Sequence, residues 1–331
     1  MPAVVRRRLL LGLALCALGL AWAGTAVAGN GGIAPVSPDS PNASRTIDAY
    51  WVIMIFTGII FVIVEGALIA FMIRFRRRGR LRTAEGPQIH GSTRLELIWT
   101  VAPVVILAFI GTFVFYKLPG IKDTPASAAG DANRVQVEGR QFYWQFTYPN
   151  GAVSIDHLKA PAGTVVPVDV SAPDFDVIHS WWIPALGGKF DAIPGKVNHT
   201  WFRAKKVGTY AGQCAELCGL QHGEMLAWVD VMEDADFRAW LEQQRRLLTE
   251  GSPELGKEIF DGVCLKCHNL GGAKLIGPTL GGNPLLKDEN GLRTLVENGR
   301  NRMPAVGRDW PDGEYEALFA YTKTLGAQGG G

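Results

Sequence analysis

Two long apolar runs near the N-terminus set the strongest limit on what this chain can fold into. They cover residues 51–73 and residues 97–116. As helices they would measure about 34 Å and about 30 Å, which is enough to cross a bilayer. The segment between them holds a cluster of arginines: Arg74, Arg76, Arg77, Arg78, Arg80 and Arg82. Short loops rich in arginine stay in the cytoplasm, so the pattern predicts a transmembrane hairpin at residues 45–117, with two buried core helices as the alternative.

The composition agrees with a membrane anchor that carries more than one further domain. The chain has 331 residues, a hydrophobic content of 47% and a mean hydropathy of +0.10. Its formal net charge of +2 gives no reason to expect a nucleic-acid partner.

The N-terminus is typical of a cleaved secretory signal. Arginines at residues 6–8 precede an apolar run at residues 9–20, and small residues follow at 26–28. We therefore predict a signal peptide at residues 1–28, whose cleavage would remove Cys16 and whose presence directs the region after the hairpin to export. The remaining cysteines belong to two chemical motifs, which leaves no pair for a structural disulfide framework.

A soluble region begins after a linker at residues 123–132 that is dominated by small and polar residues. Short β-rich runs separated by turn residues then lie at 135–139, 142–148, 164–170, 197–204, 207–212 and 226–231. Strands at this spacing predict an all-β sandwich or barrel at residues 133–232.

The segment CAELCGLQHGEM brings four soft or borderline metal ligands together: Cys214, Cys218, His222 and Met225. A further imidazole, His179, lies upstream. Thiolates, imidazoles and a thioether together favour copper, and a weak methionine ligand is typical of electron-transfer copper. A disulfide between the two cysteines or a zinc loop is the alternative, and the two histidines with the methionine weigh against both.

Neither apolar run contains a histidine, and His90 lies in the loop between them. Non-covalent haem and a membrane copper site for oxygen chemistry need imidazole ligands. Oxygen therefore cannot be reduced within this chain, which must pass electrons to another subunit.

The C-terminal part reads as a second redox domain. Residues 233–251 predict a connector helix with a partial apolar face, and a small helical domain follows at residues 252–331. This domain contains CxxCH at Cys264, Cys267 and His268, the attachment signature of c-type haem; a zinc site or a redox thiol pair is the alternative.

The expected distal haem ligand is Met303, because no other methionine follows the haem motif. A histidine and a methionine together raise the haem potential, although Met303 could also serve core packing. Residues 312–325 predict a terminal helix.

The metal segment, together with LELIWTVAP at residues 95–103, resembles subunit II of haem-copper cytochrome c oxidases, and the C-terminal domain resembles a class I cytochrome c. The resemblance implies a multidomain membrane protein with a transmembrane hairpin, a cupredoxin-like Greek-key β domain and an all-α cytochrome c domain. It also implies a dinuclear copper A centre. Its ligands would be the bridging thiolates of Cys214 and Cys218, the imidazoles of His179 and His222, the Met225 thioether and the Glu216 carbonyl. In the family this glutamate side chain also reaches a magnesium ion at the border with subunit I.

Two acidic residues in or near the apolar runs are candidates for a functional role. Glu96 would lie near the start of a proton pathway into subunit I, while a solvated acid at a helix start is the alternative. Glu65 lies within the first apolar run, where an ionisable group is a functional candidate or a hydrogen-bonding partner for another helix. Its role stays open.

Aromatic residues near the first strand bear on where electrons enter. The family carries two tryptophans here, and electrons from a soluble cytochrome c usually enter at the first, which this chain replaces with Phe142. The second is Trp144, which reads either as an aromatic relay or as core. Lys189 and Asp191 would face the partner subunit, or else form an ordinary turn.

Together these features predict subunit II of a respiratory oxidase that relays electrons from a donor through haem c and copper A to subunit I. There oxygen would be reduced to water with proton translocation. Expected partners are subunit I, subunit III, membrane lipid and a donor such as a cytochrome c or a cytochrome bc1 complex. The expected location is the bacterial inner membrane, with both redox domains on the periplasmic side. Nitrous or nitric oxide reductases and a copper-delivery or copper-sensing protein are the alternatives; LELIWTVAP disfavours the first and a covalent haem the second.

Overall fold

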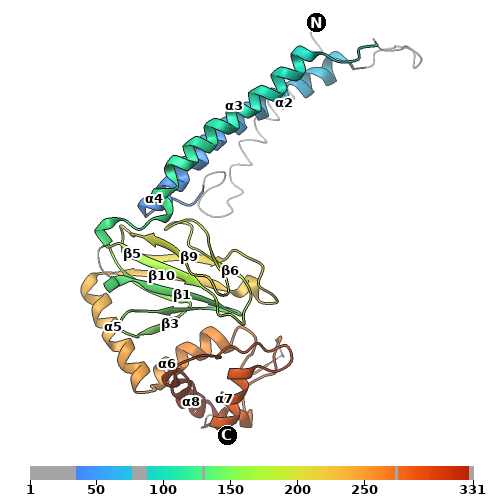
Figure 1. Cartoon of the computed structure of the whole chain (residues 1–331). Helices are drawn as coiled ribbons and strands as arrows, with labels where there is room; N and C mark the ends of the chain where they lie inside the picture. The colour runs from blue at the N-terminus through green and yellow to red at the C-terminus, as the bar shows by residue number, and fades with distance from the viewer. Residues whose placement is uncertain (1–34, 77–87, 129–130, 273–274, 328–331) are drawn as a thin grey trace, which may run out of the picture.

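The computed structural model describes residues 35–76, 88–128, 131–272 and 275–327. The predicted signal peptide and most of the arginine cluster lie outside these ranges. Figure 1 shows three parts in succession: a helical hairpin, a β-sandwich and a group of C-terminal helices. This order agrees with the predicted fold class, which is confirmed.

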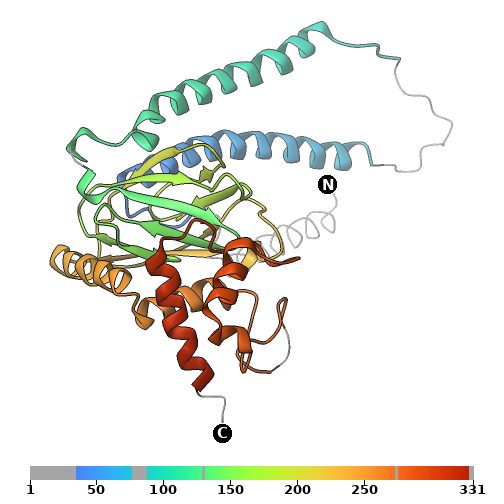
Figure 2. The same ribbon diagram turned by 60° about the horizontal axis from the view of Figure 1, so that its bottom comes forward.

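The hairpin consists of α2 (Pro41–Arg74) and α3 (Thr93–Lys117), and both helices begin before the apolar runs. Their most apolar windows have mean hydropathies of 2.7 and 2.4, and none of those residues is buried within the described chain. The two helices meet near the sandwich, where Lys117 Nζ lies 2.7 Å from Asp48 Oδ2, and they separate towards the other end (Figure 2). The apolar side chains therefore require lipid or other membrane helices around them.

The start of α2 is fixed to the sandwich. The backbone N–H of Asp39 donates to the carbonyl of Ala185 over 2.8 Å, and the Asn42 side chain donates to the carbonyl of Trp201. Asn42 and the neighbouring Ala43 are buried. Because buried polar side chains need fixed partners, these bonds hold the membrane anchor at one place on the sandwich.

The sandwich contains two five-stranded sheets. One sheet has the order β3 (Val153–Ile155), β2 (Tyr143–Thr147), β1 (Val135–Arg140), β5 (Val166–Ser171) and β8 (Asn198–Phe202). The other has the order β4 (His157–Pro161), β10 (Leu226–Met232), β9 (Gly208–Cys214), β6 (His179–Trp182) and β7 (Phe190–Ala192). The pairs β1–β5 and β4–β10 are parallel and the others are antiparallel, so long connections cross between the sheets.

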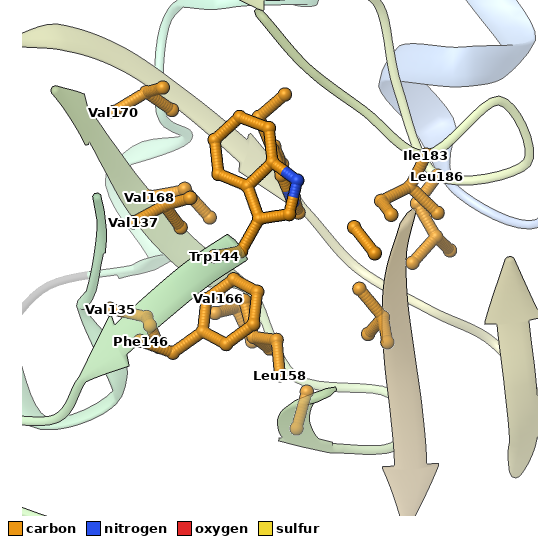
Figure 3. Packing of buried hydrophobic residues seen from close by; sticks show 14 of the residues in the cluster. Val135, Val137, Trp144, Phe146, Leu158, Val166, Val168, Val170, Ile183 and Leu186 are labelled. Atoms are coloured by element: carbon orange, nitrogen blue, oxygen red, sulfur yellow. The ribbon is translucent and has the colours of Figure 1, made fainter. Parts of the chain in front are cut away.

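Every second residue of the central strands points between the sheets. On β2 these residues are Trp144 and Phe146, and both are fully buried. Figure 3 shows them against valines from β1 and β5: Val135, Val137, Val166, Val168 and Val170. Each buried side chain of this size contributes about 1.5–3 kcal/mol, which makes this layer the main source of stability for the sandwich.

The described part of the C-terminal domain packs the α-helices α6 (Pro253–Ile259), α7 (Glu289–Asn298) and α8 (Asp312–Ala327) together. The π-helical turn η4 (Phe260–Cys264) continues α6, and the short 3-10 helix η5 (Pro284–Lys287) precedes α7. Helices α6 and α8 touch at Gly256, where a Cβ atom would lie 2.8 Å from Cβ of Tyr321. A side chain at this position would push the two helices apart.

Helix α5 (Asp234–Thr249) packs on both soluble domains. Phe237 is buried in the sandwich core, whereas Leu247 and Leu248 pack against the core of the C-terminal domain. The predicted apolar face of this connector is therefore divided between the two domains, and α5 holds them together.

The contact between the two soluble domains, here called the domain interface, has a polar centre. Tyr143 of β2 is fully buried in the C-terminal core, its hydroxyl donates to the carbonyl of Val306 over 2.6 Å, and it accepts from Trp310 Nε1 at 2.9 Å. Arg140 donates to Glu138 and, over 2.6 Å, to the carbonyl of Arg308. The two domains thus form one structure with shared buried hydrogen bonds.

Candidate functional site

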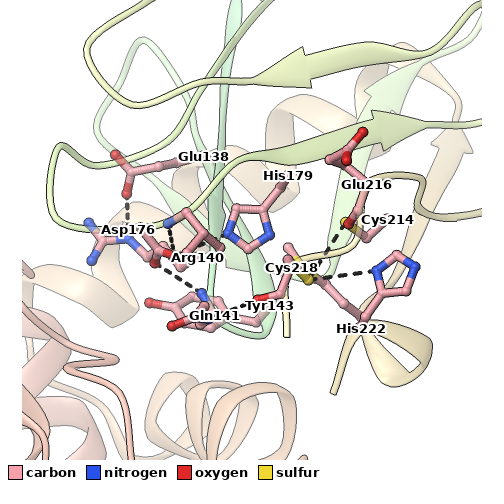
Figure 4. A network of polar contacts seen from close by, with 12 residues as sticks. Glu138, Arg140, Gln141, Tyr143, Asp176, His179, Cys214, Glu216, Cys218 and His222 are labelled. Atoms are coloured by element: carbon pink, nitrogen blue, oxygen red, sulfur yellow. Dashed lines mark hydrogen bonds and ion pairs between the residues drawn. The ribbon is translucent and has the colours of Figure 1, made fainter. Parts of the chain in front are cut away.

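Four of the predicted copper ligands converge at one end of the sandwich (Figure 4). Cys214 ends β9, and the loop after it folds back so that the Cys214 N–H donates to the carbonyl of Met225 over 2.9 Å. Sγ of Cys218 then lies 3.9 Å from Sγ of Cys214, 3.7 Å from Nδ1 of His222 and 3.8 Å from Sδ of Met225. A disulfide has an S–S distance of about 2.05 Å, so the two thiols are separate ligands in this geometry.

His179 reaches the same centre from the first residue of strand β6. Its ligand nitrogen and the two cysteine sulfurs all lie within 4.8 Å of one another, and all three residues are buried. Nε2 lies 3.2 Å from Oδ1 of Asp176, while the buried Nδ1 has no partner among the described residues. A histidine whose one nitrogen is held by a carboxylate and whose other nitrogen is free fits a metal ligand.

The charges at this site also suit a soft metal. The hydrogen bond between the two thiols lowers the pKa of Cys214 to about 3 despite burial, and His179 acts in the same direction. The neighbouring Cys214 in turn raises the pKa of Cys218. Burial opposes the protonation of His179, but its hydrogen bond with Asp176 and the negative charge of the nearby Cys214 raise its pKa overall. A thiolate is therefore available at neutral pH, and metal binding would displace the remaining protons.

Sequence reasoning missed the residues that hold these ligands in place. Asp176 accepts from the backbone N–H of Gln141 at 3.1 Å, and the Gln141 side chain donates to the carbonyl of Cys218 at 2.8 Å. Gly139 provides the space, because a Cβ there would lie 2.9 Å from Cβ of His179. The one available signal was the carboxylate three residues before His179.

Trp144 and Phe142 are close to the site but differ in position. Trp144 packs edge-on against His179, with ring centroids 6.1 Å apart, and its indole N–H has no partner among the described residues. It also belongs to the sandwich core in Figure 3. Phe142 is only 8% exposed. The geometry is compatible with either a relay role or a core role for Trp144.

The loop at residues 215–225, between β9 and β10, is here called the copper loop. Its tip faces away from the sandwich. The Glu216 carbonyl lies 3.2 Å from Sγ of Cys214, while its side chain is exposed. Leu217 and Leu220 are 78% and 58% exposed. Apolar side chains at this exposure beside a glutamate indicate a surface that another protein covers.

The remaining predicted residues are separate from the thiols. Glu96 is exposed in the first turn of α3, where its carboxylate accepts from the N–H of Ser92 at 3.3 Å, and Glu65 is exposed on α2. Lys189 is exposed, and Asp191 accepts from the Ser180 hydroxyl at 2.7 Å. No ligand role follows from these contacts.

The CxxCH motif follows α6 and is shaped for haem. Nδ1 of His268 lies 2.7 Å from the carbonyl of Pro278, which leaves Nε2 for iron. A Cβ on Gly277 would lie 2.8 Å from Nε2 of His268, so only glycine fits beside the ring. Burial raises the pKa of Cys264 to about 12 and also raises the pKa of Cys267.

Met303 lies in the loop between α7 and α8. Its N–H and carbonyl exchange hydrogen bonds with Arg300, each over 3.0 Å. Gly299 permits this turn with a φ of +67°, because a Cβ there would lie 2.6 Å from the Met303 carbonyl oxygen. The half-buried methionine is thus held in a defined loop on the haem domain.

Three family models match the chain in order. They are the transmembrane domain of cytochrome c oxidase subunit II at residues 35–116, its periplasmic domain at residues 154–232, and subunit III of cbb3-type cytochrome c oxidase at residues 251–321. Cytochrome c oxidase subunit 2 of Alkalihalophilus pseudofirmus is 31% identical, over 91% of this chain and 93% of that protein. The chain belongs to the cytochrome c oxidase subunit II family. Its prediction from the sequence is confirmed.

Other subunit II proteins match smaller parts. Cytochrome c oxidase subunit 2 of Thermostichus vulcanus is 33% identical, over 61% of this chain and 76% of its own length. The crystal structure of the periplasmic domain of subunit II from Bradyrhizobium japonicum is 33% identical, over 36% of this chain and 97% of that one, with a TM-score of 0.34.

Several conclusions follow from membership in this family. The chain is subunit II of a haem-copper oxidase with a C-terminal cytochrome c domain, a membrane protein and part of an oxidoreductase complex that includes subunit I. The subunit II domain implies copper A, which the convergent sulfur and nitrogen ligands fit, and the cytochrome c domain implies haem c.

Proposed function

We propose that this subunit II takes electrons from a donor onto its haem c, passes them to copper A and delivers them to subunit I for oxygen reduction coupled to proton translocation. The observation that carries this proposal is the position of the haem motif directly on the copper loop. The Gln221 side chain donates to the carbonyl of Lys266, which stands between the two haem cysteines. Gln221 is the residue before His222, a predicted copper ligand.

In this proposal the copper pair is held by His179, Cys214, Cys218, His222 and Met225, with the Glu216 carbonyl as a further ligand. A copper pair held by these residues would share one electron between its metals with little rearrangement. The residues supply what such a cage needs: soft sulfurs, oriented imidazoles and a buried environment with few ways to relax.

Cys264 and Cys267 would hold haem c, and His268 and Met303 would be the residues that bind its iron. The bound haem supplies one-electron chemistry, and the Pro278 carbonyl keeps the His268 ring oriented. A separate, soluble cytochrome c would not reach Phe142, the position at which electrons usually enter in other family members. Arg140 and Tyr143 flank Phe142 and are bonded to the subunit's own cytochrome domain.

Further assignments extend this role. Glu216 is exposed at the loop tip, where its carboxylate would reach magnesium at the border with subunit I, and Glu96 would stand near a proton pathway. Subunit III and a cytochrome c or cytochrome bc1 complex are proposed as the further partners. The arginine-rich loop supports a bacterial inner-membrane location with both soluble domains in the periplasm.

Changing Met303→Ala tests the direction of electron flow. Loss of the thioether lowers the haem potential, so donor-to-haem electron transfer should slow by about tenfold or more. The copper spectrum should stay unchanged, because Met303 lies on the other domain. Stopped-flow reduction of the intact complex measures both, with Met232→Ala on β10 as the matched control. An unchanged rate of electron delivery in Met303→Ala would contradict the proposed order.

A further inference from the structure

One lysine joins the haem motif to the copper loop. Lys266 stands between Cys264 and Cys267, and its side chain is 13% exposed. Its ammonium lies 2.7 Å from Oδ2 of Asp156, whose side chain is 6% exposed, and it donates to the carbonyl of Glu224 at 2.9 Å. The ion pair is therefore nearly removed from water, and each charge depends on the other.

The partners of Lys266 lie next to predicted copper ligands. Gln221 and Glu224 flank the turn that holds His222, and Glu224 directly precedes Met225. Asp156 is bonded twice to the backbone of Trp144: its N–H donates to the Trp144 carbonyl at 2.8 Å, and its carboxylate accepts from the Trp144 N–H at 2.9 Å. Lys266 thus bridges the copper loop and the strand that packs against His179.

The contact lies at an open edge of the domain interface. A crevice of about 840 Å³ lies beside it between the two domains. Its walls include His157 and Trp228 of the sandwich and Leu265 and Ile276 of the cytochrome domain. The polar contacts of Lys266 therefore act at an open edge of the domain interface, in addition to the packing of Cys267 on the sandwich core, to hold the haem motif in place.

We propose that Lys266 is the positioning residue that fixes the haem motif on the copper loop, so that electrons cross at the Gln221–Lys266 contact without domain movement. This inference rests on the proposed function. With haem c bound at Cys264 and Cys267 and copper bound at Cys214 and Cys218, the step would pass one electron from ferrous haem to the oxidised copper pair, with no bond formed or broken and no proton moved. Electron tunnelling falls steeply with distance, so a small displacement of the motif has a large effect on the rate.

The test uses Lys266→Met in the intact complex, which removes the charge and keeps most of the stem. We expect haem-to-copper electron transfer to slow by about tenfold or more, because the unpaired Asp156 carboxylate draws water into the contact. Hydrogen exchange should rise at the backbone of residues 144 and 156, a readout that does not depend on turnover. The control variant Lys257→Met removes an exposed ion pair between Lys257 of α6 and Asp261. It should change neither the electron-transfer rate nor the hydrogen exchange.

A second variant protects the test against failure of haem attachment. Gln221→Met leaves CxxCH intact and removes only the bond to the Lys266 carbonyl, so it should also slow the transfer. Adding Asp156→Asn to Lys266→Met should recover part of the rate, because no unpaired charge remains.

The outcomes separate this inference from the proposed function. Wild-type transfer rates and wild-type exchange in both Lys266→Met and Gln221→Met would overturn the positioning role. If the wild-type complex itself passes no electrons from haem to copper, the proposed function fails, and the inference fails with it. Slow transfer with raised exchange in these variants and a normal Lys257→Met would support Lys266 as the positioning residue.

Discussion

Replacing Cys218 with serine should abolish the copper A centre. Sγ of Cys218 lies within 4 Å of the ligand atoms of Cys214, His222 and Met225. A serine hydroxyl is a hard ligand that stays protonated at neutral pH, so it cannot replace a bridging thiolate for copper. We expect loss of the near-infrared absorption and of the mixed-valence resonance signal, and a fall of haem-to-subunit I electron transfer by orders of magnitude.

The haem provides the internal control for this experiment. Cys264 and Cys267 lie on the other domain, so the haem c spectrum and its reduction by the donor should be preserved in Cys218→Ser. The matched variant Cys214→Ser should lose the same copper signals. A mixed-valence signal shared over two coppers that survives in Cys218→Ser would show that the ligand set is wrong.

The stability of the domain interface should fall as pH rises, and Glu314 should be the cause. This α8 carboxyl is fully buried, and Oε1 accepts from Nε2 of Gln145 on β2 at 3.1 Å. Oε2 of Glu314 and Oε1 of Gln145 have no partner among the described residues. A protonated Glu314 would supply the hydrogen that this pair lacks, which favours the neutral acid.

Burial is the main reason why the pKa of Glu314 rises from 4.5 to about 8. The facing charges act in both directions, because Arg140 lowers the pKa while Glu138 and Glu258 raise it. The folded state therefore binds the proton more tightly than the unfolded state. The stabilisation is complete below pH 4.5 and is lost as pH rises through about 8. At about 1.4 kcal/mol for each pKa unit, the loss amounts to about 5 kcal/mol at most.

Glu314→Gln should flatten this pH dependence. Its amide stays neutral and can donate to the free oxygen of Gln145, so the interface keeps its bond without a proton. Urea unfolding followed by haem absorbance at several pH values measures the effect. Glu316→Gln, an exposed change on the same helix, should keep the wild-type slope. If Glu314→Gln shows the wild-type slope as well, the titrating group lies elsewhere.

The features that sequence predicted well are those encoded over short distances. The ligands Cys214, Cys218, His222 and Met225 follow one another within a single loop, and CxxCH is contiguous. The two membrane helices could be predicted for the same reason, because a membrane span is recognised from its length and hydropathy alone. The β domain followed from the spacing of short β-rich runs between turn residues, which predicted a sandwich or barrel, together with the family resemblance.

The features that sequence did not predict depend on contacts between distant segments. The strands β3, β4, β6 and β7 have at most five residues each, too few for a clear alternation, and none of them was among the predicted strands. Gln141 and Lys266 carry no local pattern that marks them as positioning residues. Tyr143 sits on a sandwich strand yet belongs to the core of the cytochrome domain, which follows only from how the two domains pack.

The most direct test of the relay is the order in which the centres of the wild-type complex are reduced. The oxidised complex is mixed rapidly with reduced donor in the absence of oxygen, and the absorptions of haem c, copper A and the haem of subunit I are followed together. The relay predicts that haem c is reduced first, copper A second and the subunit I haem last. Reduction of copper A before haem c, or at an unchanged rate when haem c is kept oxidised, would contradict it.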